Sequence, residues 1–212
     1  MGGLFPDAFS GCYCILAMLE ALYHRVNTGE GQHIEIAMTE VLATLLPEAV
    51  MEYTLDGTEP ERVGNRHQYK VPHNVFRCQG QENWVAISVE SDAQFQALAQ
   101  VAGIPGWADD HRFANAEARL KHQDELEPLI QEWTMGLQVE DVVQILQLAG
   151  VPAGPVLDSA QVLADPHMID RGFVQSPNHR EVGQRPMGTF SWNVDGDRPG
   201  VPMTAPLLGE HN

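Results

Sequence analysis

Asp7-Ala-Phe-Ser-Gly-Cys-Tyr-Cys-Ile-Leu-Ala-Met-Leu-Glu-Ala-Leu-Tyr23 contains the most apolar run of this 212-residue sequence. A helix drawn through residues 8–23 carries apolar side chains on nearly every side, so we predict that it is buried. Asp7 stands at the N-cap position, and His24 and Arg25 follow near the other end, where basic residues complement the helix dipole. The stretch therefore predicts a core helix entered through Asp7.

Asp7 has two interpretations. The simpler one is a cap, whose side chain accepts hydrogen bonds from the first backbone N–H groups. The other is chemical, because a helix N-terminus favours the ionised carboxylate, and an ionised carboxylate can attack an acyl group. The residues by themselves leave both interpretations open.

The segments beyond this helix alternate between strand and helix patterns, which indicates an α/β fold. Residues 34–38 alternate as a short strand, and Pro47 should kink the helix expected over residues 41–53. Later patterns predict a hairpin around residues 79–83, followed by helices over 91–102, 115–133 and 140–149 and a strand over 151–157. The polarity and periodicity of the sequence change at Gly57 and again at Gly150, which suggests three parts. Residues 1–56 and 151–212 would be portions of a large lobe, residues 57–74 a crossover, and residues 75–150 a small α+β lobe.

The composition limits the classes of function. With 43% hydrophobic residues the chain can bury a core, and its formal charge of -17 argues against general binding to nucleic acid or to an anionic membrane. The run from Cys12 to Leu19 is shorter than the ~20 residues that a membrane span needs. Three cysteines are too few for a disulfide framework and no signal peptide is visible, so we expect a cytoplasmic protein.

Positive charge gathers in one stretch. Residues 62–77 hold four of the twelve Lys and Arg residues and two histidines but no Asp or Glu; these are Arg62, Arg66, Lys70, Arg77, His67 and His73. An anionic ligand would be expected to bind here, and a solvated basic loop explains the composition equally well. The nine histidines and three cysteines lack the spacing of a zinc site, so we expect no metal.

The sequence also resembles the class III CoA-transferases, which include formyl-CoA, carnitine and bile-acid CoA transferases. The resemblance begins with Asp7-Ala-Phe-Ser-Gly11, the apolar helix and His24-Arg25-x-x-Thr28-Gly-x-Gly-Gln32. Each later block is weak alone, but eight blocks in family order are hard to obtain by chance. They are Gly64-Asn-Arg-His67, Trp84-Val-Ala-Ile87, Asp109-Asp-x-Arg-Phe113, Arg119 with Asp124-Glu-Leu126, Gly150-Val-Pro-x-Gly-Pro-Val156, Asp165-Pro, Arg171-Gly172 and Ala205-Pro-Leu-Leu-Gly-Glu-His211.

This resemblance implies a fold and a mechanism. The large lobe would be Rossmann-like, although the long N-terminal segment of family members has no counterpart in this sequence. In such enzymes the aspartate that matches Asp7 attacks an acyl-CoA thioester, and CoA passes to a small carboxylic acid through an aspartyl intermediate. CoA and acyl-CoA are then substrates, and a homodimer, interlocked as in family members, is expected.

The resemblance also suggests substrate-binding residues. Met38 falls where the family has a pocket-lining methionine, and a core residue at a strand end fits its position about equally well. Arg66 and His67 belong to a region that matches a glycine-rich loop over the aspartate in the formyl-CoA branch, although residues 64–72 contain a single glycine. Glu90 resembles an acidic residue near the site of a related branch, and an exposed residue before a helix cap is its simpler interpretation.

Two other functions remain open. The α-methylacyl-CoA racemases share the fold and use the matching aspartate for proton transfer, which loss of an α-proton to deuterated solvent would reveal. The remaining alternative is a folded, possibly dimeric module without activity, which direct measurement of CoA binding would separate from an enzyme.

Overall fold

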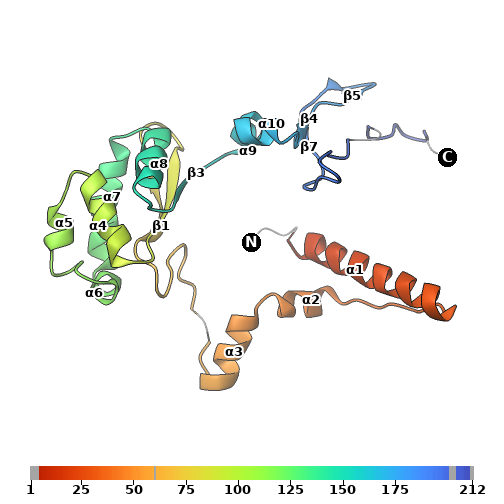
Figure 1. Cartoon of the computed structure of the whole chain (residues 1–212), viewed down its shortest axis with the longest axis horizontal. Helices are drawn as coiled ribbons and strands as arrows, with labels where there is room; N and C mark the ends of the chain where they lie inside the picture. The colour runs from red at the N-terminus through yellow and green to blue at the C-terminus, as the bar shows by residue number, and fades with distance from the viewer. Residues whose placement is uncertain (1–4, 60, 201–203, 211–212) are drawn as a thin grey trace. The chain divides into compact units, whose positions relative to one another are not determined.

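The computed structural model of the protein describes residues 5–59, 61–200 and 204–210, so His211 of the last family block lies outside the described residues. The chain divides into two compact units, Met1–Arg62 and Val63–Asn212, and each is described by itself (Figure 1). Helices and strands occur together, as the predicted α/β class requires. The grouping of residues 1–56 with 151–212 in one lobe stays a prediction.

The first unit consists, in its described part, of three helices: α1 (Phe5–Thr28), α2 (Met38–Thr44) and α3 (Pro47–Asp56). The strand that we predicted over residues 34–38 is absent, since residues 31–37 have no regular structure and residue 38 begins α2. Pro47 starts a helix where we predicted a kink. The first turn suits proline because the N–H groups there have no partner within the helix.

Asp7 is not the N-cap that the sequence predicted. α1 begins at Phe5, so Asp7 lies inside the first turn of the helix. Pro6 explains the earlier start, because its fixed backbone angle suits the first helical residues. A carboxylate in the first turn still interacts favourably with the helix dipole.

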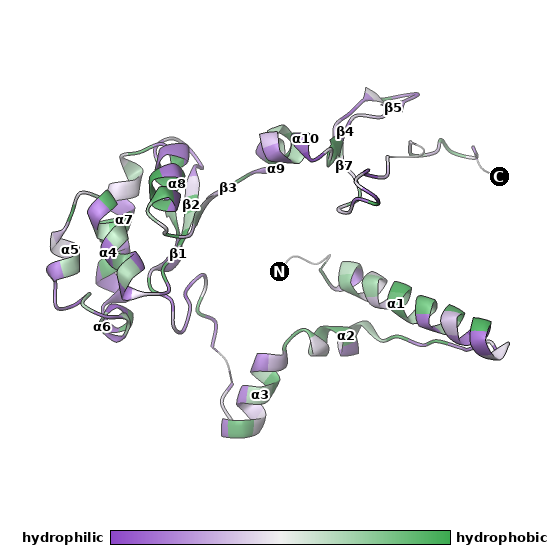
Figure 2. Ribbon diagram, in the orientation of Figure 1, coloured by the Kyte–Doolittle hydropathy of each residue, from purple (hydrophilic) through white to green (hydrophobic). Residues whose placement is uncertain are grey.

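The apolar residues of α1 are largely exposed, which corrects the prediction of a buried core helix. Ile15, Leu16 and Leu19 have 56%, 64% and 59% of their surface accessible, and Ser10 is the buried residue of α1. Green, hydrophobic residues follow much of the helix in Figure 2. The physical reason is one of size, since α2, which packs against α1, has 7 residues and α1 has 24.

α1 is also long and apolar enough to cross a membrane, with a mean hydropathy of 1.3 over an 18-residue window. The length criterion by which we excluded a span therefore does not hold, because the helix extends well beyond the run from Cys12 to Leu19. Core helices of soluble proteins and signal sequences share this length and composition, so the property does not select among these environments.

The second unit contains a three-stranded antiparallel sheet in the order β1-β2-β3, formed by His73–Arg77, Trp84–Ser88 and Ala153–Val156. The β1-β2 hairpin lies where the sequence predicted one. β3 follows Gly150, where we placed the end of the small lobe, so this sheet extends beyond that boundary.

Helices cover one face of this sheet. α7 packs on β1, and α8 packs on β2, β3 and α4. The single helix predicted over residues 115–133 is instead two helices, because the backbone of His122 leaves the helical conformation. The described helices of this unit are α4 (Asp92–Val101), α5 (Gly106–Asp109), α6 (Ala116–Lys121), α7 (Gln123–Met135), α8 (Val139–Leu148), α9 (Ser159–Ala164) and α10 (Pro166–Asp170). Beyond α10, short strands pair as β4 (Val174–Gln175) with β7 (Met187–Gly188) and β5 (Asn178–His179) with β6 (Gly183–Gln184).

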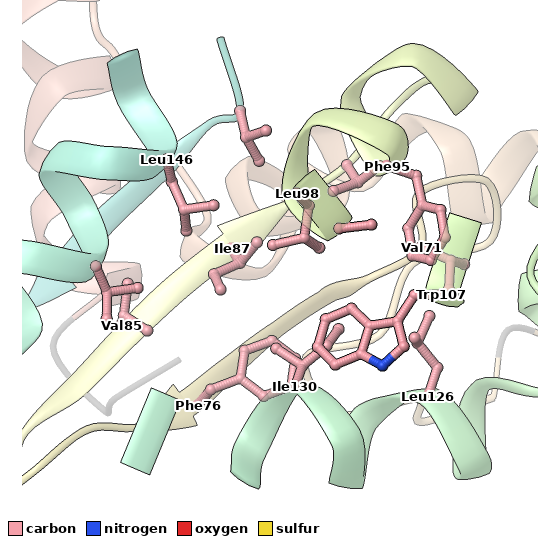
Figure 3. Packing of buried hydrophobic residues seen from close by; sticks show 14 of the residues in the cluster. Val71, Phe76, Val85, Ile87, Phe95, Leu98, Trp107, Leu126, Ile130 and Leu146 are labelled. Carbon is pink, nitrogen blue, oxygen red and sulfur yellow. The ribbon is translucent and has the colours of Figure 1, made fainter. Parts of the chain in front are cut away.

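The hydrophobic core lies between the sheet and its covering helices (Figure 3). Phe76, Val85 and Ile87 reach it from the strands, and Leu98 and Ile130 reach it from α4 and α7. Leu98, Val85 and Ile130 are fully buried. Removing this much apolar surface from water is the main favourable contribution to the folding of the unit.

A charged side chain, Arg119, is buried beside this core with 1% of its side chain exposed. Its Nε donates to the Val71 carbonyl at 3.0 Å, and Nη1 donates to the Phe113 carbonyl at 3.1 Å. Nη2 lies 2.8 Å from Asp92 Oδ1, and the guanidinium carbon stands 4.6 Å from the centre of the Phe95 ring. Arg119 thus joins α6 to the crossover, to the loop before α6 and to α4.

We expect Arg119→Met to lower the free energy of unfolding by about 1–3 kcal/mol, because the Val71 and Phe113 carbonyls lose their buried hydrogen-bond donor. Urea denaturation followed by circular dichroism measures the change. Lys121→Met on the same helix is the control, since Lys121 is exposed and pairs with the exposed Glu117. A loss for Arg119→Met no larger than that of the control would contradict the structural role of Arg119.

A polar cluster and a groove in the second unit

The predicted site residues fall into two groups. Asp7 and Met38 belong to the first unit, and Arg66, His67 and Glu90 belong to the second. Asp7 is exposed in the first turn of α1, and Met38, the first residue of α2, is 49% exposed. Each group is considered within its own unit.

Arg66 is held by carboxylates of α7. Its Nη2 lies 2.6 Å from Asp124 Oδ1 and 2.6 Å from Glu127 Oε2, and Nε donates to Glu127 Oε1 at 3.2 Å. These hydrogen bonds raise the pKa of the Arg66 guanidinium further above its ordinary value. The pairing fixes the loop at residues 64–66 against α7.

Glu127 is the centre of this arrangement. In addition to Arg66, it accepts hydrogen bonds from Asn74 Nδ2 at 2.9 Å and Gln123 Nε2 at 3.0 Å. Burial alone would raise the pKa of the Glu127 carboxyl, but hydrogen bonds from Arg66, Asn74 and Gln123 outweigh it and lower that pKa. Glu127 therefore connects helix, loop and strand β1 while ionised.

Lys70 and Glu90 form a second ion pair, between the Lys70 Nζ and Glu90 Oε1 atoms. The hydrogen bond and the charge of Lys70 lower the pKa of Glu90, and His67 lowers it further. The His67 ring lies 5.3 Å from the His73 ring and 5.9 Å from the Tyr69 ring, measured between centroids. His67 thus lies with the Lys70–Glu90 pair, and Arg66, the residue before His67, is held by α7; these four residues are called the polar cluster.

A groove of about 580 Å³ lies beside this cluster. The loop at Gly64, Asn65 and Arg66 contributes to its lining, together with all three strands of the sheet. Val75, Ala86 and Gly154 are cross-strand neighbours, on the face opposite the core residues Phe76, Val85 and Ile87. Because Ala86 and Gly154 have little or no side chain, they leave space for the groove on this face of the sheet. His73, Asn74, Ser88, Pro152 and Ala153 also line the groove.

Sequence reasoning missed the acidic partners of the basic stretch. Asp124 and Glu127 lie on α7, and no local pattern connects them to Arg66 about sixty residues earlier. Asp124 belonged to a family block, but its spacing carried no sign of the contact. Of the charges that concentrate in residues 62–77, those of Arg66 and Lys70 are therefore compensated in the folded unit.

The lining of the groove suits the binding of a small molecule. Within the described residues, no group of three His, Cys, Asp or Glu side chains has a geometry that could hold a metal ion. Imidazoles, amides and a hydroxyl line or border a partly apolar groove, and such mixed linings are typical of small-molecule sites.

Glu127→Gln should lower the free energy of unfolding at pH 7 by about 1–3 kcal/mol, since hydrogen bonds to a charged group are lost. A carboxylate with a lowered pKa stabilises the fold above its unfolded pKa of about 4.3, and this contribution disappears as the pH falls through the folded value. The difference between the two proteins should therefore shrink in acid. Denaturation curves from pH 7 to pH 3 test this, and Glu132→Gln, at an exposed residue of the same helix, is the control. A difference independent of pH would show that Glu127 acts without its charge.

Comparison with known proteins identifies the family. The model of CoA-transferase family III matches residues 1–212. The chain is 32% identical over 206 residues to succinyl-CoA–D-citramalate CoA-transferase of Chloroflexus aurantiacus, covering 97% of this chain and 51% of the relative. It is 34% identical over 172 residues to succinate–glutarate CoA-transferase of Agrobacterium fabrum, covering 81% of this chain and 42% of the relative.

A solved structure agrees with these relatives. The crystal structure of a CaiB/BaiF family protein from Brucella suis superposes with a TM-score of 0.87 at 31% identity, covering 100% of this chain and 54% of that one. The chain spans about half the length of the curated relatives it matches. Residues 1–212 belong to CoA-transferase family III.

Proposed function

We propose that the protein, at the length of its relatives, transfers CoA from an acyl-CoA to a carboxylic acid through a covalent intermediate on Asp7. The observation that carries this proposal is the family match over the whole chain, with Asp7 exposed in the first turn of α1. A first-turn position supports the role because the helix dipole favours the ionised form of the carboxylate.

The proposed reaction proceeds in balanced steps. A carboxylate oxygen of Asp7 attacks the thioester carbonyl carbon, the C–S bond breaks, and CoA leaves as a thiolate, so that a mixed anhydride forms. The thiolate attacks the aspartyl carbonyl, releasing the first acid and leaving an aspartyl-CoA thioester. The acceptor carboxylate then attacks the aspartyl carbonyl carbon of this thioester, which expels the CoA thiolate and forms a second mixed anhydride. The thiolate attacks the acceptor's carbonyl carbon in that anhydride, so that the new acyl-CoA forms and Asp7 leaves as a free carboxylate. Covalent catalysis divides one difficult exchange into easier ones.

We propose dicarboxylic acids as the substrate class. The matched proteins are named for succinyl-CoA and D-citramalate, for succinate and glutarate, and for succinyl-CoA and mesaconate. Substrate-binding roles are proposed for Met38 within the first unit and for Arg66, His67 and Glu90 within the second. Arg66 and Glu90 would act mainly by holding the loop, because both are paired in the folded unit.

A cytoplasmic homodimer, interlocked as in the family, completes the proposal. The exposed apolar side chains of α1 support it, because large exposed apolar surfaces commonly mark contacts with another chain. Light scattering at micromolar concentration should give twice the chain mass, and a monomer in the protein completed to the relatives' length would refute the dimer.

Asp7→Asn and Asp7→Ala should abolish CoA transfer in a protein completed to the length of the relatives, because neither side chain can attack the thioester. Stability should change little, since a charge in the first turn of a helix contributes about 0.3–1 kcal/mol. Transfer from succinyl-CoA to glutarate, followed by chromatography of the CoA esters, measures activity.

Chemical trapping provides an independent test. Hydroxylamine added with succinyl-CoA should displace CoA from the intermediate and convert the Asp7 carboxyl to a hydroxamate, which mass spectrometry of the tryptic peptide detects. Glu20→Gln, on the same helix, should retain both activity and trapping. Transfer by Asp7→Asn, or a hydroxamate on another residue, would show that Asp7 is not the nucleophile.

A further inference from the structure

The permanent cations beside the groove are neutralised within the folded unit. Arg66 pairs with Asp124 and Glu127, and Lys70 pairs with Glu90. Arg77, farther along β1, lies 3.7 Å from Glu82 and stacks on the Trp84 ring. An anion in the groove would therefore depend on polar groups other than these cations.

The two histidines have distinguishable nitrogen atoms. His73 Nδ1 lies 2.7 Å from the Asn65 carbonyl oxygen, and a carbonyl can only accept, so Nδ1 must carry a proton. His67 Nδ1 accepts from the Tyr69 backbone N–H at 3.1 Å, which places the proton of neutral His67 on Nε2. Nε2 of His73 is thus the nitrogen available to a ligand, as an acceptor when neutral and as a donor when protonated.

His73 lies at the groove, beside a second polar side chain. His73 is the first residue of β1 and lines the groove, and Ser88 is its partner across the β1-β2 register. Residues opposite one another in this way have side chains on the same face, about 5 Å apart at Cβ. Within the described ranges the Ser88 hydroxyl has no hydrogen-bond partner, so it can donate to a ligand.

The orientation of His73 also depends on the ion pair described above. The carbonyl that holds His73 belongs to Asn65, and the next residue, Arg66, is fixed by Glu127. A fixed carbonyl behind an imidazole sets its tautomer and ring orientation, as it does for other functional histidines.

We propose that His73 and Ser88 form a subsite for a carboxylate group. The imidazolium donates through Nε2 to one carboxylate oxygen, and the Ser88 hydroxyl donates to the carboxylate beside it. The proposal rests on the proposed function only for the choice of ligand, which is a carboxylate of a dicarboxylic acid. Two donors at adjacent positions of neighbouring strands suit the two oxygens of this group.

Nuclear magnetic resonance of the imidazole nitrogens tests the subsite in the chain itself. At a pH near 6, titration with succinate should shift the Nε2 resonance of His73. The uncharged diamide succinamide should not shift it, and His111, whose side chain is 95% exposed, should respond to neither. Equal shifts at His73 and His111, or no shift at His73, would overturn the proposal.

Variants measure the contribution of each donor. His73→Gln and Ser88→Ala should each weaken succinate binding about tenfold, as expected for a lost hydrogen bond to a charged group, while His111→Gln should not. Thermal unfolding verifies that each variant is folded. If a variant is unfolded, the resonance titration of the unaltered chain decides whether the subsite exists. Succinate binding at His73 without transferase activity in the completed protein would refute the proposed function alone. Transfer with no effect of His73→Gln on the KM for the acid would refute the subsite alone.

Discussion

The buried guanidinium of Arg119 is the interaction on which the second unit depends. It contacts two backbone carbonyls and the carboxylate of Asp92, and it stacks on Phe95. An arginine suits this position because its planar fork offers several donors in fixed directions. Its contact with the Val71 carbonyl fixes the end of the crossover where it enters β1. The loop that carries Arg66 and His67 therefore ends at a defined point beside the core.

A second constraint continues from this point to the groove. Glu127 projects from the core helix α7 and binds Arg66, and the neighbouring Asn65 carbonyl holds His73. Each link is a direct hydrogen bond between side chains or between a side chain and the backbone. The polar cluster is therefore an extension of the packed core, although the loop itself has no regular structure.

The two units differ in how far their side chains are packed or paired within the unit. In the described part of the second unit, Arg119 and Glu127 have hydrogen-bond partners, and a hydrophobic core is packed between sheet and helices. The first unit leaves residues such as Leu16 and Val26 accessible at 64% and 81%. The proposed dimer would cover such side chains, and apolar surface that leaves water stabilises the state that buries it.

The sequence by itself determined the α/β class, the β1-β2 hairpin and most helix positions, because alternation, turn residues and caps act over short distances. It also indicated the family, through a resemblance carried by blocks of residues in family order. It placed Asp7 near a helix start, but the N-cap prediction was wrong because Pro6 allows the helix to begin earlier. It also predicted that α1 is buried, which was wrong, because composition does not show which elements pack on a helix. The tertiary structure decided which charges near the groove are compensated, because Arg66 forms an ion pair with Glu127 of α7 and Lys70 forms one with Glu90. It also decided the tautomer of His73, because the carbonyl that fixes a ring nitrogen comes from a loop eight residues away. Contacts between distant residues depend on how the core brings elements together, and no local pattern records them.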